Sequence, residues 1–427
     1  MKKIRFLTVL VCFLLAALML VSCNETGTGE KDTTENSDTV PETDPSTESG
    51  SEETGPQEIP TSLTAEVIKR GLVGREVSGK LKYHGWPSIC VDEKGTLYAV
   101  ASVRLRHICP YGRNVMYTST DGGITWSAPV VINDSVMDER DVGITYLGNG
   151  KMLISYFYHS TSFYFSDDSM RFWRSYVTDA EYNELVQTWG ALSDAEQLGG
   201  SFVRISEDYG KTWGEPVRVP ISAPHGPVVT NSGKLLYVGS ASYGDLGTGI
   251  YAVESADDGK SWKVKGEIPI PENLLKNGYR VAEPHVVQLS NNRILVAIRY
   301  QGSATNDIDI LTCYSDDWGY TWTMAKDMDF NGAPPHLLEL DNGVVVLSYA
   351  KRTWKNGICA RLSYDRGETW SDEILLDAPN DRDSSDLGYP ATVQLEDGSL
   401  VTVYYRWYES DRLPSIMYTK WKLNETE

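Results

Sequence analysis

An eight-residue motif, Ser-x-Asp-x-Gly-x-(Thr/Ser)-Trp, constrains the fold of this chain more than any other feature, because it occurs five times. The copies begin at Ser119, Ser206, Ser255, Ser315 and Ser363. Each copy has the composition of a β-turn, since the Asp carboxylate can accept backbone N–H bonds and the Gly can adopt a positive φ. The Trp is then expected to pack back between sheets. Five matches to so long a pattern indicate a repeated β architecture in which the motif has a structural role.

A second repeat, a turn followed by a strand, counts the units of that architecture. It occurs six times, and a short apolar strand precedes each copy. The six segments are DEKGTLYAVAS, LGNGKMLISYF, TNSGKLLYVGS, LSNNRILVAIR, LDNGVVVLSYA and LEDGSLVTVYY. Successive copies lie about 50 to 60 residues apart, which is the length of a four-stranded propeller blade, except that the second unit is longer. The excess, about residues 160 to 200, contains the helix-like DAEYNELVQTWGALSDAEQ and is expected to be an insertion on one face.

These repeats predict an all-β fold, a six-bladed β-propeller that occupies residues 61–427. The Trp-containing motif joins the third and fourth strands of a blade, and the last blade, which ends at SIMYTKWKL, has no such motif after it. Its fourth strand must then come from the start of the domain, within about residues 63 to 80. This pairing would close the ring and leave no free sheet edge.

The first 23 residues have the pattern of an export signal. Lys2, Lys3 and Arg5 precede the apolar run FLTVLVCFLLAALML, and small residues follow before Cys23. The ending resembles a bacterial lipobox, which implies cleavage before Cys23 and lipid on its sulfur; ordinary secretion with cleavage nearby is the alternative. Buried acyl chains would hold an exported lipoprotein on a membrane, facing the cell exterior or the periplasm.

Residues 24–60 are acidic, rich in Ser, Thr and Pro, and nearly without apolar side chains. Such a segment cannot bury enough surface to fold, so it is expected to be a disordered linker. Much of the net charge of −20 lies in this segment and says little about partners. No basic patch suited to nucleic acid is present, and no apolar run after residue 23 is long enough to span a bilayer.

The cysteines beyond the signal do not have the spacing of a metal site. They are Cys90, Cys109, Cys313 and Cys359, with no Cys-x-x-Cys pair among them. Three of them lie in strand-like segments and are expected in the core, while a bridge between Cys90 and Cys109 is open in an exported protein. The histidines also lack a helical ligand spacing, so the sequence predicts neither a metal nor a cofactor.

Polar residues gather at two places in each blade that meet at one face of a propeller. The innermost strand begins at this face, and the second strand ends there, so residues at both places should converge on one pocket. The residues at the starts of the innermost strands are His84, Trp86, Arg140, Asp141, His225, Glu283, His285, His336 and Tyr389. The residues at the ends of the second strands and just after them are Arg104 to Arg113, His159, Arg299, Lys351 and Arg352. All six histidines of the chain belong to this set, which indicates a functional channel mouth.

With its Trp-containing motifs, known as Asp boxes, and its six repeats, the chain from residue 80 to 424 resembles the sialidase (neuraminidase) superfamily of BNR-repeat proteins. Members of that family hold a sugar carboxylate with three arginines, attack with a tyrosine activated by a glutamate, and use an aspartate as acid and base. The resemblance implies that Glu283 is the glutamate and Tyr389 the nucleophile. It also implies that Arg299 and Arg352 are members of the arginine triad.

Two departures from the family pattern fall in the first blade. Where the family has Arg-Ile-Pro, this chain has Gly85-Trp86-Pro87, and the segment from Arg104 to Ser119 has no carboxylate. Substitutes for the missing groups are nearby. His107 could donate the proton, Arg104 or Arg113 could bind an anion, and Arg140 with Asp141 points in from the second blade.

The function that this combination predicts is an exo-acting glycoside hydrolase of sialidase type, monomeric, with a glycan as its substrate. Tyr389, Glu283, His107 and Asp141 are the expected catalytic residues. The expected substrate-binding residues are Arg299, Arg352, Arg104, Arg113, Arg140, His225, His285, His336 and Trp86. One alternative is another exo-glycosidase or a lyase that uses His107, His225 or His336 with Tyr389. A glycan-binding propeller without catalysis is the other.

Overall fold

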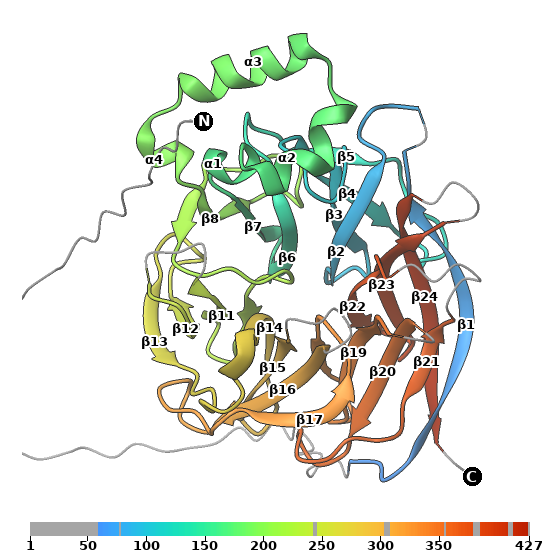
Figure 1. Ribbon diagram of the computed structural model, residues 1–427. Coiled ribbons are helices and arrows are strands. Elements are labelled where there is room, and N and C mark those ends of the chain that lie inside the picture. The colour runs from blue at the N-terminus through green and yellow to red at the C-terminus, as the bar shows by residue number, and fades with distance from the viewer. Residues whose placement is uncertain are drawn as a thin grey trace, which may run out of the picture. The chain divides into compact units, whose positions relative to one another are not determined.

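Six four-stranded antiparallel sheets form the folded part of the chain. The computed structural model describes residues 59–76, 78–241, 246–302, 308–353, 356–378, 385–408 and 413–425. The predicted signal of residues 1–23, with Cys23, and nearly all of the predicted linker lie outside the described residues. The sheets are arranged as the blades of a ring, with β2, β6, β14 and β22 toward its middle and β1, β13 and β17 on its outside (Figure 1). The six-bladed propeller expected from the repeats is therefore confirmed.

Each of the first five blades consists of consecutive strands. Blade 1 contains β2 (Tyr83–Val91), β3 (Leu97–Arg104), β4 (Gly112–Ser119) and β5 (Val130–Asn133). Blade 2 contains β6 (Arg140–Gly148), β7 (Lys151–Tyr158), β8 (Gly200–Ser206) and β9 (Val217–Val219). Blade 3 contains β10 (Val228–Val229), β11 (Leu235–Ser240), β12 (Ile250–Ser255) and β13 (Lys263–Glu267). Blade 4 contains β14 (Arg280–Gln288), β15 (Ile294–Gln301), β16 (Ile308–Ser315) and β17 (Lys326–Asn331). Blade 5 contains β18 (His336–Glu339), β19 (Val345–Lys351), β20 (Gly357–Ser363) and β21 (Ile374–Asp377).

Blade 6 joins the two ends of the domain. It contains β22 (Gly388–Gln394), β23 (Leu400–Trp407) and β24 (Pro414–Glu425), and its outermost strand is β1 (Leu63–Gly74). The ladder between β1 and β24 runs from the pair Leu63 and Glu425 to the pair Gly74 and Ile416. Closure by an N-terminal strand, which the missing sixth Asp box required, is confirmed.

The Asp boxes connect the third and fourth strands and also fill the seams between blades. In the first box, Asp121 accepts hydrogen bonds from the backbone N–H groups of Ile124 and Thr125. Gly123 has a φ of +84°, and the Trp126 indole donates to its carbonyl. Trp126 packs against the hydrophobic cluster between blades 6 and 1, and each later box Trp packs into the seam with the preceding blade. The boxes are structural, as their composition predicts.

The seam between blades 5 and 6 has no box Trp. Its cluster is covered instead by apolar residues on and just before the closing strand, Ile59, Leu63, Ala65, Val67 and Leu72. The N-terminal strand therefore supplies both the last ladder and the apolar cover of the seam that lacks a box.

A helical insertion separates β7 from β8 in blade 2, as predicted. It contains α1 (Thr161–Tyr164), α2 (Asp167–Trp173), the 3-10 turn η1 (Arg174–Tyr176), α3 (Asp179–Gly190) and α4 (Asp194–Gln197). A capping box at Thr178 and Glu181 begins α3. The insertion has its own hydrophobic cluster around Trp173 and Trp189, which also packs against Cys109 and Met137. It therefore lies over the loop that follows β3. A second 3-10 turn, η3 (Lys276–Gly278), precedes β14.

Two further features concern the core and the membrane. Cys90, Cys109, Cys313 and Cys359 are all buried free thiols, so the bridge left open between Cys90 and Cys109 is not formed. Among the described residues, no helix has the length and apolar character needed to cross a bilayer.

Candidate active site

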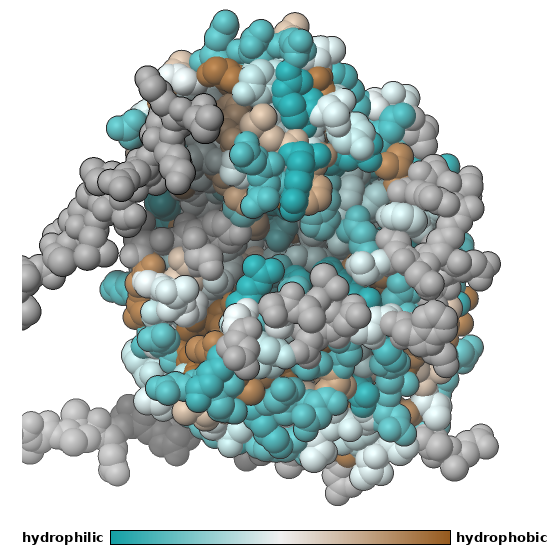
Figure 2. Space-filling model, in the orientation of Figure 1, coloured by the Kyte–Doolittle hydropathy of each residue, from teal (hydrophilic) through white to brown (hydrophobic). Residues whose placement is uncertain are grey.

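A cavity of about 960 Å³ lies at the face where the innermost strands begin. It is lined by residues of several blades, and Figure 2 shows this face hollowed near its middle, with hydrophilic residues above and below the hollow. The predicted residues that line it are Trp86, His107, Arg140, Asp141, Glu283, Arg299, Arg352 and Tyr389. Ring closure therefore brings eight of the thirteen predicted active-site residues to one cavity.

The backbone aims four of these side chains in the same way. Trp86, Asp141, Glu283 and Tyr389 are non-glycine residues with positive φ, between +48° and +53°. Each lies where the first strand of its blade shifts register against the second strand. Bulges of this kind redirect a side chain and are frequent beside active sites, where the surrounding structure maintains the backbone strain. The same local device therefore presents one residue from each of blades 1, 2, 4 and 6.

Tyr389 and Glu283 form a hydrogen-bonded pair across the cavity. The Tyr389 hydroxyl donates to Oε1 of Glu283 at 2.7 Å, and Nη1 of Arg299 donates to Oε2 at 2.5 Å. Burial alone would raise the pKa of Glu283, but the Arg299 charge and the two hydrogen bonds lower it below its usual value. Burial raises the pKa of Tyr389 well above its usual value, so the phenol keeps its proton until a base removes it. A carboxylate stands in hydrogen-bond contact with the proton that it would accept.

Arg352 and Asp141 have polar atoms that the protein does not satisfy. Nε of Arg352 donates to the carbonyl of Leu387 at 2.9 Å, while its buried Nη2 has no hydrogen-bond partner among the described residues. Oδ1 of Asp141 is likewise buried and unpartnered within the described part of the chain. Burial raises the pKa of Asp141 to about 7. Both side chains line the cavity, so these two atoms can form hydrogen bonds with polar groups of a ligand.

His107 lies on the loop after β3. It contacts Tyr83, the first residue of β2 in blade 1, and Asp386, which comes just before β22 of blade 6. Its Nδ1 is 2.7 Å from the Tyr83 hydroxyl and 3.2 Å from Oδ1 of Asp386. Its side chain is 52 % exposed, in contrast to Asp141, which is 8 % exposed. His107 is thus at the open side of the cavity, and Asp141 is in its floor.

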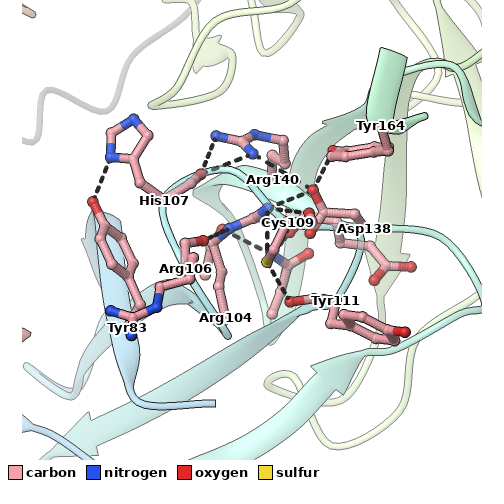
Figure 3. A network of polar contacts seen from close by, with 12 residues as sticks. Tyr83, Arg104, Arg106, His107, Cys109, Tyr111, Asp138, Arg140 and Tyr164 are labelled. Atoms are coloured by element: carbon pink, nitrogen blue, oxygen red, sulfur yellow. Dashed lines mark hydrogen bonds and ion pairs between the residues drawn. The ribbon is translucent and has the colours of Figure 1, made fainter. Parts of the chain in front are cut away.

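A buried charged network holds the His107 loop (Figure 3). Nη2 of Arg104 donates to Oδ2 of Asp138 at 2.5 Å, and the Tyr164 hydroxyl of α1 donates to the same oxygen. Both terminal nitrogens of Arg140 donate to the carbonyl of His107, at 3.2 and 3.1 Å. Arg104 also donates to the carbonyl of Cys109 at 3.0 Å. The helical insertion is therefore connected to the cavity through side chains that bind the loop backbone.

Five residues predicted to bind substrate lie elsewhere. Arg104 is fully buried under the loop and pairs with Asp138, so it does not reach the cavity. Arg113 faces away and pairs with Asp134 at 3.6 Å. His225, His285 and His336 form a buried cluster of rings, with centroids 4.1 to 5.4 Å apart. Burial lowers the pKa of His336 to about 3, and burial with the neighbouring imidazoles lowers the pKa of His225 and His285 well below the usual value. Arg104 and the three histidines are core positions, and Arg113 lies on the surface. A residue at a strand start or end can therefore face the core or solvent as well as the cavity.

Two residues that the prediction did not single out contact His107. Tyr83 begins β2, and Asp386 comes just before β22. Part of the cavity wall also comes from blades 3 and 4, with Ser222, Ile268 and Tyr279. The segment DLGYP, in which an acid precedes Tyr389 by three residues, is the only sequence signal that pointed toward Asp386.

The polar groups that line the cavity suit an organic ligand. Among the described residues, no group of three or more His, Cys, Asp or Glu side chains is arranged to hold a metal ion. The cavity instead combines guanidinium groups, carboxylates, a phenol and an imidazole. Such a set can bind an oxygen-rich anion by paired hydrogen bonds and can transfer protons.

The fold and this cavity define a protein of the sialidase superfamily. A sequence profile described as a BNR repeat-like domain matches residues 180–403, more than half of the chain, and the chain belongs to that family. No curated protein sequence matches the chain significantly.

Solved structures share the fold at low sequence identity. A protein of unknown function from Dyadobacter fermentans is 20% identical, with a TM-score of 0.67 over 84% of this chain and 99% of that one. The NanB sialidase from Streptococcus pneumoniae is 13% identical, with a TM-score of 0.55 over 83% of this chain and 70% of that one. A Trypanosoma rangeli sialidase in complex with the inhibitor DANA is 15% identical, with a TM-score of 0.53 over 79% of this chain. The chain spans 55% of the length of that sialidase. Identities this low establish the propeller and leave the reaction to the residues of the site.

Proposed function

We propose that this protein is an exo-acting glycoside hydrolase of sialidase type, which removes a terminal sialic acid or a similar acidic sugar from glycans. The observation that carries the proposal is the hydrogen bond of 2.7 Å from the Tyr389 hydroxyl to Glu283, in a cavity with arginines. A phenol beside a carboxylate is a nucleophile beside its base. A phenol is also neutral, so it is not repelled by an anionic sugar as a carboxylate nucleophile would be.

The reaction would proceed in two displacements. As the Tyr389 oxygen bonds to the anomeric carbon, its proton passes to Glu283, and the glycosidic C–O bond breaks. The leaving oxygen takes a proton from an acid at the open side of the cavity. Water then attacks the anomeric carbon and gives a proton back to that acid, the bond to Tyr389 breaks, and the proton on Glu283 returns to the phenolate. The sugar leaves with retained configuration.

The free polar atoms support an acidic sugar as the substrate. The unpartnered Nη2 of Arg352 is a donor for a carboxylate oxygen, and the unpartnered Oδ1 of Asp141 is an acceptor for a sugar hydroxyl. Arg299 is held in place by Glu283 and Gln301, which accept from its two terminal nitrogens, the latter at 2.6 Å. Arg352 therefore offers a donor to an anion in the cavity.

A second candidate, an exo-glycosidase that acts on a different sugar, is favoured by one observation. Trp86, at the place where the family has its first arginine, is buried between the guanidinium groups of Arg104 and Arg140, at 5.2 and 4.8 Å from its ring centroid. Neither arginine is free to replace the missing one, since both bind the His107 loop. A pocket with fewer free guanidinium groups binds a carboxylate less strongly and so suits a neutral sugar better.

The test is release of a sugar from defined glycosides. Purified protein would be incubated with a fluorogenic sialoside and with a panel of uronic-acid and neutral glycosides, beside Tyr389→Phe and Glu283→Gln. We expect release of one terminal sugar that both substitutions abolish. Release of sialic acid that Tyr389→Phe leaves unchanged would refute the nucleophile, while binding of glycans without any release would favour a binding propeller.

We propose further that the propeller is exported and tethered to a membrane through a lipid on Cys23, with the acidic segment after it as a spacer. The support is the sequence pattern of residues 1–23 alone. Cys23→Ser should release the protein from the membrane fraction. A variant that remains membrane-bound would refute the anchor.

A further inference from the structure

His107 meets Tyr83 and Asp386 at the seam between blades 1 and 6. We propose that Tyr83 and Asp386 are positioning residues that hold His107 as the acid and base of this cavity, with Nε2 facing the leaving group. The proposal rests on the proposed function and adds a histidine relay to it. Tyr389 lines the cavity, whereas Tyr83 and Asp386 are not among its lining residues. Their effect on the reaction therefore passes through the imidazole of His107.

The hydrogen bonds fix which nitrogen carries the proton. Burial alone would raise the pKa of Asp386, but the hydrogen bonds from His107 and Tyr83 and the charge of Arg352 lower it, so this carboxylate is ionised and only accepts. Burial raises the pKa of Tyr83 well above its usual value, so Tyr83 keeps its single proton. At 2.7 Å from Oδ1 of Asp386, the Tyr83 hydroxyl donates there, and its oxygen must accept from Nδ1 of His107. Neutral His107 is therefore protonated on Nδ1, and Nε2 carries the lone pair.

Nε2 of His107 is available to a substrate. The hydrogen bonds of the ring to described residues all involve Nδ1, and Figure 3 shows the other edge of the ring directed away from Tyr83. The groups that face the imidazole are Tyr83, Asp386, the Trp86 ring with its centroid at 5.1 Å, and Arg140, which binds the His107 carbonyl. Because Nδ1 is engaged by Tyr83 and Asp386, Nε2 is the ring nitrogen left for a substrate.

His107, and not Asp141, is placed to reach a leaving group. An exo-acting pocket is closed below the sugar, so the rest of the glycan must extend toward the opening. His107 is at the open side with half of its side chain exposed, whereas Asp141 is buried in the floor. Geometry decides which proton donor reaches the glycosidic oxygen, before acidity does.

The proton balance of the relay is complete. In the first displacement, Nε2–H of the imidazolium gives its proton to the leaving oxygen while the phenol proton passes to Glu283. In the second, Nε2 takes a proton from the attacking water while Glu283 returns its proton to the Tyr389 oxygen. Enzyme and protons return to their starting state, and no other reactant is needed.

The kinetic test compares two leaving groups on one sugar. The 4-nitrophenyl and methyl glycosides of the sugar that the panel above identifies would be used, N-acetylneuraminic acid first. A nitrophenolate leaves without a proton and a methoxide does not, so His107→Ala should lower kcat/KM for the methyl glycoside by about 10²- to 10⁴-fold. For the 4-nitrophenyl glycoside we expect a loss of less than about tenfold. An equal loss on both substrates would overturn the proposal, while turnover by the wild-type protein would keep the proposed function.

The positioning residues have a separate readout. Asp386→Asn should lower kcat/KM for the methyl glycoside more than for the 4-nitrophenyl glycoside, because it weakens the acceptor that orients His107 through Nδ1. Tyr405→Phe is the matched control, since Tyr405 also donates to Oδ1 of Asp386, at 3.1 Å, without contacting His107. This variant should show no such difference between the two substrates. Equal losses on both substrates in folded Asp386→Asn protein would contradict the relay.

Nitrogen-15 chemical shifts of the His107 ring test the tautomer without any turnover. We expect Nδ1–H in the neutral ring of the wild-type protein, and a mixture of tautomers once both acceptors are removed, in the double variant Tyr83→Phe with Asp386→Ala. A wild-type ring protonated on Nε2 would overturn the proposal. If no glycoside in the panel is cleaved, the proposed function falls and the catalytic role of His107 falls with it.

Discussion

The cavity has two halves that differ in what holds them. In the half made by blades 4 and 6, Glu283 contacts both Tyr389 and Arg299 directly, and each of the three is close to the start or end of a strand. In the half made by blades 1 and 2, His107 stands on a loop and depends on Arg140, which pairs with the fully buried Asp138. The first half resembles the sialidase pattern, and the second departs from it.

This difference teaches where a propeller can change its chemistry. The backbone of the sheet sets the direction of a side chain on a strand bulge, so the residues around it in the cavity can be substituted without moving it. A residue on a loop needs a support of its own, and here a helical insertion provides it through Tyr164 of α1. We infer that the insertion and the substituted first blade belong together as one unit of the site.

Tyr389→Phe should have the largest effect, because it removes the proposed nucleophile from the half that resembles the family. We expect kcat to fall by at least about 10⁴-fold, as for nucleophiles in other covalent mechanisms. The folded structure should persist, since the ring remains. Steady-state kinetics and circular dichroism together check this. Residual activity above one per cent of the wild-type value would show that the nucleophile does not lie in the half made by blades 4 and 6.

Asp138→Asn should have the next largest effect, on the half held by the insertion. It leaves Arg104, which is fully buried, without its carboxylate, and removing one partner of a buried pair costs about 3–5 kcal/mol of the free energy of unfolding. Asp134→Asn is the matched control, because the pair of Asp134 with Arg113 is well exposed. Urea unfolding of both variants gives the comparison. Equal stability of the two would show that the network does not support the loop.

Asp141→Asn should change how stability depends on pH. Burial raises the pKa of Asp141 to about 7, so the folded protein holds this proton more tightly than the unfolded chain does. Stability is then lost as pH rises from about 4 to about 7, by up to about 1.4 kcal/mol per pH unit. The Asn variant should lose this dependence.

Glu139→Gln is the control for Asp141→Asn. Burial raises the pKa of Glu139 to about 7 as well, but Glu139 does not line the cavity. Both variants should flatten the pH dependence of unfolding, and only Asp141→Asn should alter the pH profile of turnover. A flat wild-type curve would contradict the burial of these two carboxyls.

Tyr164→Phe should have the smallest effect. It removes one hydrogen bond to the buried Asp138 carboxylate, which contributes about 1.5 kcal/mol to the free energy of unfolding. Tyr182→Phe, in the same insertion, removes a hydroxyl that does not contact Asp138. The unfolding temperatures of the two variants should differ by a few degrees. Equal unfolding temperatures would show that the insertion does not stabilise the loop through Tyr164.

The sequence predicted the fold well because its information is local and repeated. Each Asp box contains its own turn chemistry, and the missing sixth box pointed to the closing strand. The pocket was predicted less completely, since a strand end can face the channel or the core. His225 and His285 lie at predicted strand starts and are buried, whereas Asp386, which the prediction did not single out, contacts His107. Contacts across the seam of blades 1 and 6 join residues 279 apart in the chain, and no local pattern marks them.

The most direct test of the account is to trap the sugar on the protein. A glycosyl fluoride with a second fluorine beside the anomeric carbon forms the covalent intermediate and slows its hydrolysis, because fluorine destabilises the positively charged transition state. Mass spectrometry of the digested protein should then show one added sugar on Tyr389. A label on Glu283 or Asp141, or turnover of glycosides with no label at all, would contradict the central claim.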